Sequence, residues 1–151
     1  MRLKQLLLTL AVCALSFLMV GCGGGGGGTA DTTLPTITSA ALVPASVAWP
    51  GGSVTVRVAA SDASGIASVN VDITNSITSA VTRQTLSQVS AGVYEYSYSV
   101  AYTGTGAQQQ TYTYSVTVKD NANNAKTQSA GQIVFNPIKS AEIVQVYRDM
   151  S

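Results

Sequence analysis

Apolar and polar residues alternate with a period of two across much of the region from Leu34 to Phe135. In Ser53–Ala59, for example, Val54, Val56 and Val58 share one face. Such alternation is typical of β-strands that bury one face. The pattern predicts about seven strands: Thr36–Val43, Ser53–Ala59, Ile66–Ile73, Val81–Val89, Val93–Val100, Thr111–Val118 and Lys126–Phe135.

The spacing of these segments predicts an all-β domain, a single antiparallel β-sandwich. Turn residues such as Pro50-Gly51-Gly52 and Ala91-Gly92 separate the segments. The connections are too short for the crossovers of a parallel sheet. Short strands at this density are typical of a sandwich. The alternative is an up-and-down barrel, which the odd number and uneven spacing of the strands disfavour.

Several motifs in this region resemble those of bacterial immunoglobulin-like or fibronectin-III-like domains. They are the segments 50–56, 61–69, 92–94 and 114–124. The resemblance covers most of residues 34–136 and implies an immunoglobulin-like sandwich that serves as a spacer, an adhesion module or an accessory binding module. The chain has Asn123-Asn124 where that family often has Gly-Asn. Because Asn tolerates the left-handed conformation better than most residues, we expect the turn to be retained.

The N-terminus has the pattern of a secretory signal. Arg2 and Lys4 precede an apolar run from Leu6 to Val20. As a helix the run would span roughly 22 Å, short of the roughly 30 Å hydrocarbon core of a bilayer. The run ends at Met19, Val20, Gly21 and Cys22, a sequence that resembles the lipobox of bacterial lipoproteins. An ordinary signal peptide with a chance cysteine is the alternative.

The lipobox resemblance implies that residues 1–21 are removed and that Cys22 carries diacylglycerol and a fatty acyl group. Two or more chains give stable anchoring, whereas one gives marginal binding. The implied partner of Cys22 is therefore the lipid bilayer, and the implied location is the bacterial cell envelope. The absence of Asp after Cys22 favours the outer membrane, with the domain facing the periplasm or the surface. Cys13 leaves with the signal, so no free thiol or disulfide is expected.

Two flanking segments surround the predicted domain. Residues 22–33 comprise Cys22 and a flexible tether that begins with the glycine run Gly23–Gly28. Residues 137–151 form a C-terminal tail, for which two structures remain open. Ser140 could cap a short helix, or Ile143–Tyr147 could add a strand.

Composition narrows the range of functions. Charged residues make up 10% of the chain, against about 25% in a typical soluble domain. The formal net charge is +1, which disfavours nucleic-acid binding. Histidine is absent, so mechanisms that need an imidazole base are excluded. Asp62, Asp120 and Glu95 are the acidic groups from which catalysis could be built, but no nucleophile or oxyanion hole is recognisable, so we expect no enzyme.

Oxygen-bearing side chains follow the second and sixth predicted strands, whose loops lie at the same end of such a sandwich. They are Asp62, Ser64, Asp120, Asn121, Asn123 and Asn124. Oxygen ligands in such loops suit Ca²⁺, which takes six to eight of them. Alternatively, Asp and Asn cap the turns of their own backbone. Two carboxylates and no Asp-x-Asp spacing predict weak calcium affinity at best, and no metal site is assigned with certainty.

Aromatic residues offer a second candidate surface. Most of the tyrosines fall between Tyr94 and Tyr114. Because Tyr94, Tyr96 and Tyr98 alternate with polar residues, we expect them to face the core rather than form a sugar-binding row. Trp49, which precedes Pro50, is expected to plug a strand end rather than to serve as a ligand platform. We therefore expect a lipid-anchored, non-catalytic binding or adhesion module for an unidentified protein or glycan, with a structural subunit or spacer of an envelope assembly as the alternative.

Overall fold

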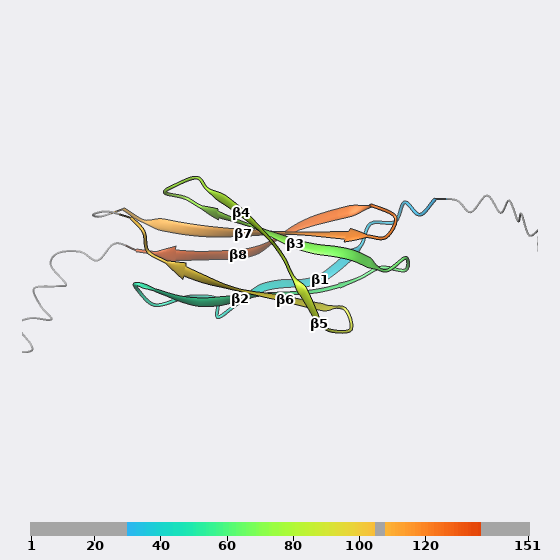
Figure 1. The fold of residues 1–151 in the computed structure, drawn as a ribbon, viewed down its shortest axis with the longest axis horizontal. Helices are drawn as coiled ribbons and strands as arrows, with labels where there is room; N and C mark the ends of the chain where they lie inside the picture. Colours follow the sequence, from blue (N-terminus) through green and yellow to red (C-terminus); the bar gives the residue numbers. More distant parts are fainter. Residues whose placement is uncertain (1–29, 105–107, 137–151) are drawn as a thin grey trace, which may run out of the picture. The chain divides into compact units, whose positions relative to one another are not determined.

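The computed structural model describes residues 30–104 and 108–136. This part of the chain contains eight β-strands: β1 (Thr36–Val43), β2 (Gly51–Ser61), β3 (Ile66–Asn75), β4 (Val81–Thr85), β5 (Ser87–Ser90), β6 (Val93–Ala101), β7 (Gln110–Asp120) and β8 (Ala125–Phe135). They form two four-stranded antiparallel sheets that face each other (Figure 1). The predicted β-sandwich is confirmed, with eight strands instead of about seven. Because the sheets are separate, the barrel alternative is wrong.

The strand order places this sandwich close to the immunoglobulin constant type. One sheet has the order β1-β2-β6-β5 and the other has the order β4-β3-β7-β8. Constant-type domains pair strands A, B, E and D in one sheet and C, F and G in the other. Here β4 adds a strand at the edge of the second sheet, next to β3.

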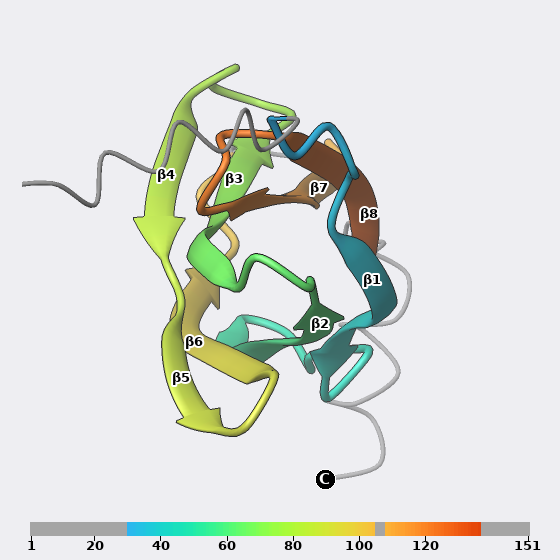
Figure 2. The same cartoon turned by 90° about the vertical axis from the view of Figure 1, so that its right-hand side faces the viewer.

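The predicted strand Val81–Val89 is wrong as a single element. It is divided at Leu86 into β4, which pairs with β3, and β5, which pairs with β6 in the other sheet. The Leu86 side chain is 4% exposed, and its N–H donates to the Val69 carbonyl at 2.8 Å. Figure 2 shows the chain crossing from one layer to the other between β4 and β5. The crossing occurs here because burial of this leucine in the interior stabilises the change of sheet.

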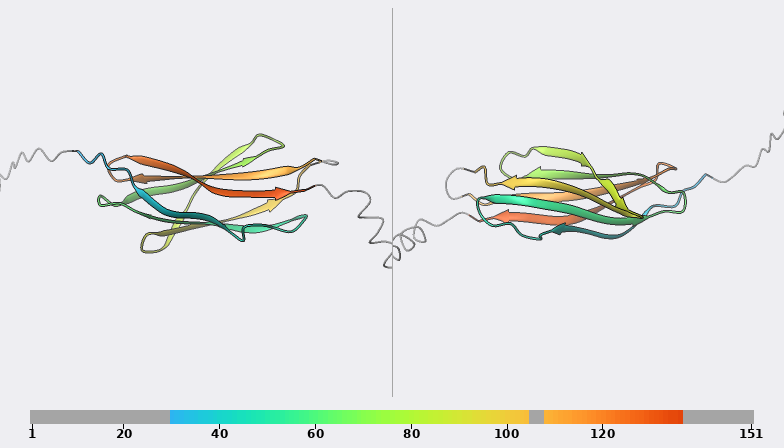
Figure 3. Two further views of the ribbon diagram at one scale, coloured as in Figure 1. Left: turned by 180° about the vertical axis from the view of Figure 1, so that it is seen from behind. Right: turned by 60° about the horizontal axis from the view of Figure 1, so that its bottom comes forward.

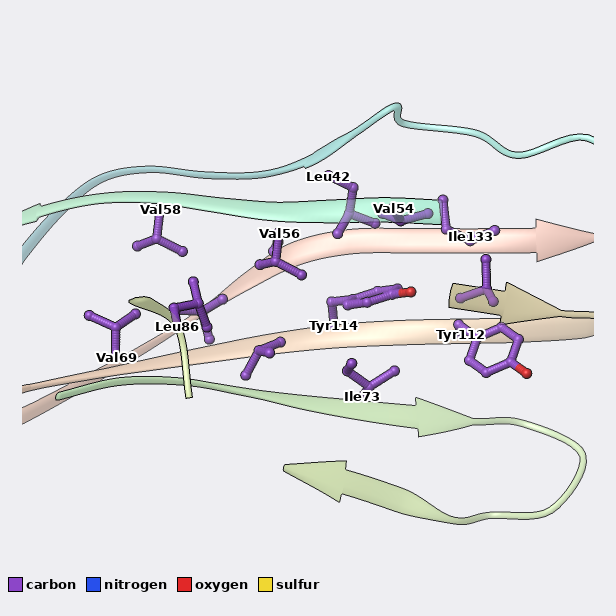
Figure 4. Packing of buried hydrophobic residues seen from close by; sticks show 14 of the residues in the cluster. Leu42, Val54, Val56, Val58, Val69, Ile73, Leu86, Tyr112, Tyr114 and Ile133 are labelled. Carbon is purple, nitrogen blue, oxygen red and sulfur yellow. The ribbon is translucent and has the colours of Figure 1, made fainter. Parts of the chain in front are cut away.

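The core lies between the sheets and consists of the residues that alternation placed on one face. Val54, Val56 and Val58 of β2 are fully buried, as are Tyr114, Val116 and Val118 of β7. Figure 4 shows Tyr114 between the valines of β2 and Ile73 of β3. Each such side chain contributes roughly 1.5–3 kcal/mol through removal from water.

The tyrosines of β6 pack against this core. Tyr94, Tyr96 and Tyr98 are partly buried and contact the hydrophobic cluster, which confirms the prediction that they face inward. Tyr112 and Tyr114 of β7 are buried among the same residues. The hydroxyl of Tyr112 donates to the Ala101 carbonyl at 2.9 Å. The hydroxyl of Tyr114 has no hydrogen-bond partner within the described part of the chain.

The two ends of the sandwich differ in chemistry. The tether end comprises residues 31–33, the β2–β3 loop 62–65 and the β7–β8 turn 121–124. The distal end comprises the β1–β2 loop 43–50, residues 101–104 and 108–110, and residues 135–136. Figures 1 and 3 show the chain entering the sandwich at the tether end and β8 ending at the distal end. Among residues 30–104 and 108–136, no helix is long and apolar enough to cross a bilayer.

Candidate functional site

Three carboxylates converge at the tether end. Asp31 precedes β1, Asp62 follows β2 and Asp120 is the last residue of β7, and one oxygen of each lies within 4.8 Å of the others. The prediction that the loops after β2 and β7 share one end is therefore confirmed. Sequence analysis placed Asp31 in the tether and counted two carboxylates where the structure brings three together.

Asp31 could have been found from strand pairing. Because β1 runs antiparallel to β2, residues that precede β1 must lie beside residues that follow β2. In the structure, Asp31 belongs to the same compact unit as the sandwich. The Asn124 side-chain amide donates to the Asp31 main-chain carbonyl at 3.0 Å. The Asp31 carboxylate accepts a 2.9 Å bond from the N–H of Thr33, and this bond lowers its pKa.

Asp120 is the buried member of the cluster, with 0% of its surface exposed. Its two carboxylate oxygens accept bonds of 2.8 Å from the main-chain N–H and the side-chain amide of Asn124. These bonds close the β7–β8 turn, in which Asn123 has a φ of 73°. The expectation that Asn would retain this left-handed turn is confirmed. Asn123 contributes backbone geometry, and its side chain is exposed.

Asp62 organises the β2–β3 loop. Its Oδ1 accepts bonds from the N–H and the hydroxyl of Ser64, at 2.8 and 2.7 Å. The side-chain amide of Asn121 donates to the Ser64 carbonyl at 2.7 Å, which joins this loop to the β7–β8 turn. The turn-capping interpretation thus holds for Asp62 and Asp120, whose carboxylates accept bonds from the main-chain N–H of Ser64 and of Asn124. The side chains of Ser64 and Asn124 donate further bonds to the same two carboxylates.

The charge of the cluster is not balanced by a basic side chain. In residues 30–104 and 108–136, the ion pairs are Arg57–Glu95 at 3.1 Å and Arg83–Asp72 at 2.6 Å, both on strand faces. Glu95 therefore pairs across the sheet with Arg57 and does not join Asp62 and Asp120. Three carboxylates at this separation repel one another, and a bound cation would remove that repulsion.

The separation of the carboxylates is compatible with Ca²⁺. Ca²⁺–oxygen distances of 2.3–2.6 Å allow two ligands of one ion to lie up to about 5 Å apart. The three oxygens lie within 4.8 Å of one another, which is inside that range. Each carboxylate has about four lone-pair sites, and none of the three accepts more than two of the hydrogen bonds described above, so acceptor capacity remains.

Other predicted positions have different outcomes. The lipobox residues Met19, Val20, Gly21 and Cys22, and the tail 137–151, lie outside the described residues. Trp49 does not plug a strand end, because 52% of it is exposed in the loop before β2.

Comparison with known families places the sandwich in a defined group. Residues 29–150 match a family described as "Domain of unknown function (DUF7743)". The chain belongs to this family. No curated protein matches the sequence. The matched region begins two positions before Asp31, which agrees with the assignment of Asp31 to the domain.

Proposed function

We propose that the chain is a lipid-anchored protein of the bacterial cell envelope whose sandwich is a non-catalytic binding or adhesion module. Support for the anchor comes from the basic start, the short apolar run and Cys22 after Gly21. In this proposal acylated Cys22 inserts into the bilayer, with the outer membrane favoured. The glycine run then links the lipid to the folded domain.

One structural observation carries the binding role. The chain enters the sandwich at Asp31, and the loops around Trp49 lie at the opposite end (Figure 1). A domain anchored through residues before Asp31 is therefore attached at the end opposite Trp49, which leaves the distal end free of the attachment point. An exposed tryptophan at that end is suited to recognition, whereas a spacer needs no exposed aromatic residue.

We further propose that Ca²⁺ occupies the carboxylate cluster and strengthens the junction between tether and domain. The proposal is supported by the approach of three carboxylate oxygens to within 4.8 Å, by the full burial of Asp120, and by the ion pairs of the described residues, neither of which includes a member of the cluster. Three carboxylates and no preformed cage favour a dissociation constant in the range of extracellular modules, about 0.1–1 mM.

Intact-mass analysis of protein extracted from membranes tests the anchor. The expected mass is that of a chain beginning at Cys22 plus a diacylglyceryl and an acyl group, and Cys22→Ala should abolish both the added mass and membrane retention. Retention of residues 1–21, or an unmodified thiol on the membrane-extracted protein, would contradict the proposal.

A second experiment separates the binding module from the alternative role as a structural subunit. Crosslinking in intact cells, followed by mass spectrometry, locates the residues in contact with partners. A binding module predicts crosslinks at the distal end. A subunit of an assembly predicts crosslinks along the sheet edges formed by β1, β4, β5 and β8.

A further inference from the structure

We propose that the distal end binds a neutral polysaccharide, with the indole of Trp49 as the platform on which a sugar ring stacks. This inference rests on the proposed function, because it names the class of ligand that the distal end of the module would take. The ligand expected is a β-linked chain of glucose-type rings, whose faces present C–H groups to an aromatic ring while their hydroxyls point outward.

Trp49 is the only tryptophan of the chain. Its side chain is large and apolar, yet 52% of the residue is exposed. Exposed tryptophan forgoes part of the stabilisation that burial would provide. Val43, at the other end of the same loop, is also exposed. Two of the five exposed large apolar residues in the described part of the chain thus belong to one loop of the distal end.

The indole packs against a second aromatic ring. The ring centroids of Trp49 and Tyr102 are 6.5 Å apart, with an interplanar angle of 45°. Tyr102 lies in turn at 6.4 Å from the ring of Phe135, the last residue of β8. The loop that carries Trp49 thus packs against Tyr102, and Tyr102 packs against the end of β8.

Hydrogen bonds hold this support in place. The N–H of Tyr102 donates to the Pro50 carbonyl at 2.8 Å, and its hydroxyl donates to the Gln108 carbonyl at 2.8 Å. The fully buried Gln110 accepts from the N–H of Thr103 at 2.8 Å and has its side-chain amide 3.1 Å from the Thr103 hydroxyl. A platform held in this way loses little entropy when a ligand binds, which favours affinity from a small contact.

The charge of the distal end matches a neutral ligand. The described segments of this end, 43–50, 101–104, 108–110 and 135–136, contain no Asp, Glu, Lys or Arg. They are rich instead in amides and hydroxyls, the groups that hydrogen-bond sugar hydroxyls. Gln108 is exposed, and the Gln109 side-chain amide donates to that of Asn136 at 2.8 Å. The clustered carboxylates of Asp31, Asp62 and Asp120 lie at the opposite end of the sandwich.

Fluorescence tests this inference directly, because the single tryptophan reports on its own site. The protein is the lipidated chain extracted in a detergent without a sugar headgroup. The probes are cellohexaose and the hexamer of N-acetylglucosamine, with a hexamer of galacturonic acid as the charged control. The expected result is a saturable change in Trp49 emission with at least one neutral hexamer and none with the acidic one.

Calorimetry on variants completes the test. Trp49→Ala should weaken binding by at least about tenfold, equivalent to about 1.4 kcal/mol. Trp49→Phe should retain part of the affinity because a smaller ring still stacks. Val89→Ala removes another exposed apolar side chain, on β5, and should leave binding unchanged. Absence of a saturable change with either neutral hexamer, or binding that survives Trp49→Ala, would overturn the inference.

The experiments would also reveal two other occupants of this surface. Concentration-dependent dimerisation that is lost in Trp49→Ala would assign the surface to a second copy of the chain and overturn the inference. The same holds if removal of residues 137–151 increases acrylamide quenching of Trp49, since the tail would then cover the indole. If intact-mass analysis shows the lipid on Cys22 but the protein binds neither hexamer, only the polysaccharide proposal is refuted and the anchor proposal stands.

Discussion

The side-chain amide of Asn124 donates a 3.0 Å hydrogen bond to the main-chain carbonyl of Asp31, 93 positions earlier in the chain. The same amide nitrogen lies 2.8 Å from Oδ2 of the buried Asp120. One side chain thus holds the entry of the chain against the β7–β8 turn. This bond fixes where the chain enters the sandwich, and it brings Asp31 towards Asp62 and Asp120.

Calcium is expected to raise the melting temperature of the domain. At about ten times the dissociation constant, binding to the folded state alone adds about 1.4 kcal/mol, or roughly 6 °C for a domain of this size. Asp62→Asn should abolish the response because it removes one charged ligand. Without calcium, the same variant should melt slightly higher than the wild type, since repulsion within the cluster decreases. Differential scanning calorimetry with and without CaCl₂ measures both effects.

The matched control for that prediction is Asp72→Asn. Asp72 forms a bidentate pair with Arg83, with bonds of 2.7 and 2.6 Å, and this pair lowers the pKa of Asp72. The control should lose a little stability without calcium and keep the full calcium response. An equal loss of response in both variants, or no response in the wild type, would contradict a site at Asp31, Asp62 and Asp120.

Asn124→Ala should destabilise the fold by about 2 kcal/mol. It removes the side-chain donor of a buried, charged carboxylate, and hydrogen bonds to charged groups contribute about 1.5–3 kcal/mol. Asn136→Ala, which removes one exposed amide contact with Gln109, should cost less than about 0.5 kcal/mol. Urea denaturation measures both. Equal stability of the two variants would show that Asn124 does not hold the junction.

Tyr114→Phe should stabilise the domain by about 1 kcal/mol or more. The Tyr114 hydroxyl is buried without a hydrogen-bond partner in the described part of the chain, and an unsatisfied buried polar group costs about 1–3 kcal/mol. Tyr112→Phe should have the opposite sign, because the Tyr112 hydroxyl donates to the Ala101 carbonyl. Melting temperatures compared at pH 7 check this. A loss of stability in both variants would mean that the Tyr114 hydroxyl is satisfied.

Alkaline unfolding gives a second measurement on Tyr114. Burial raises the pKa of this hydroxyl above its ordinary value of 10.0. Above about pH 10 the unfolded chain releases a proton that the folded chain retains, so stability falls as the pH rises. Tyr114→Phe should reduce this fall between pH 10 and 11. Burial also raises the pKa of Tyr98, so some of the fall should remain.

Leu86→Ala should destabilise the fold by about 2–5 kcal/mol, the usual cost of truncating a buried leucine. The loss should be accompanied by faster hydrogen exchange in β4 and β5, because Leu86 holds the crossing between them. Val89→Ala on β5, where the side chain is exposed, should change stability by less than about 0.5 kcal/mol. If both variants lose the same stability, Leu86 does not stabilise the crossing.

The alternation of apolar and polar residues identified the strands well where one face is buried and the other is exposed to solvent. Val54, Val56 and Val58, and the inward tyrosines of β6, were placed correctly because burial follows the pleat. The change of sheet at Leu86 was missed, since a single apolar residue in a polar segment does not show which core it enters. Trp49 was misplaced for a similar reason: sequence does not show how much of a loop side chain remains exposed.

The antiparallel sandwich follows from the amino-acid sequence alone, because alternation and short connections are local properties of the chain. The neighbourhood of Asp62 and Asp120 follows as well, since the ends of β2 and β7 meet in that architecture. The packed fold is needed to show that Asp31 completes the cluster, that Asn124 holds it there, and that Trp49 stays exposed beside Tyr102. Those relationships join residues far apart in the chain, and their distances depend on how the sheets pack.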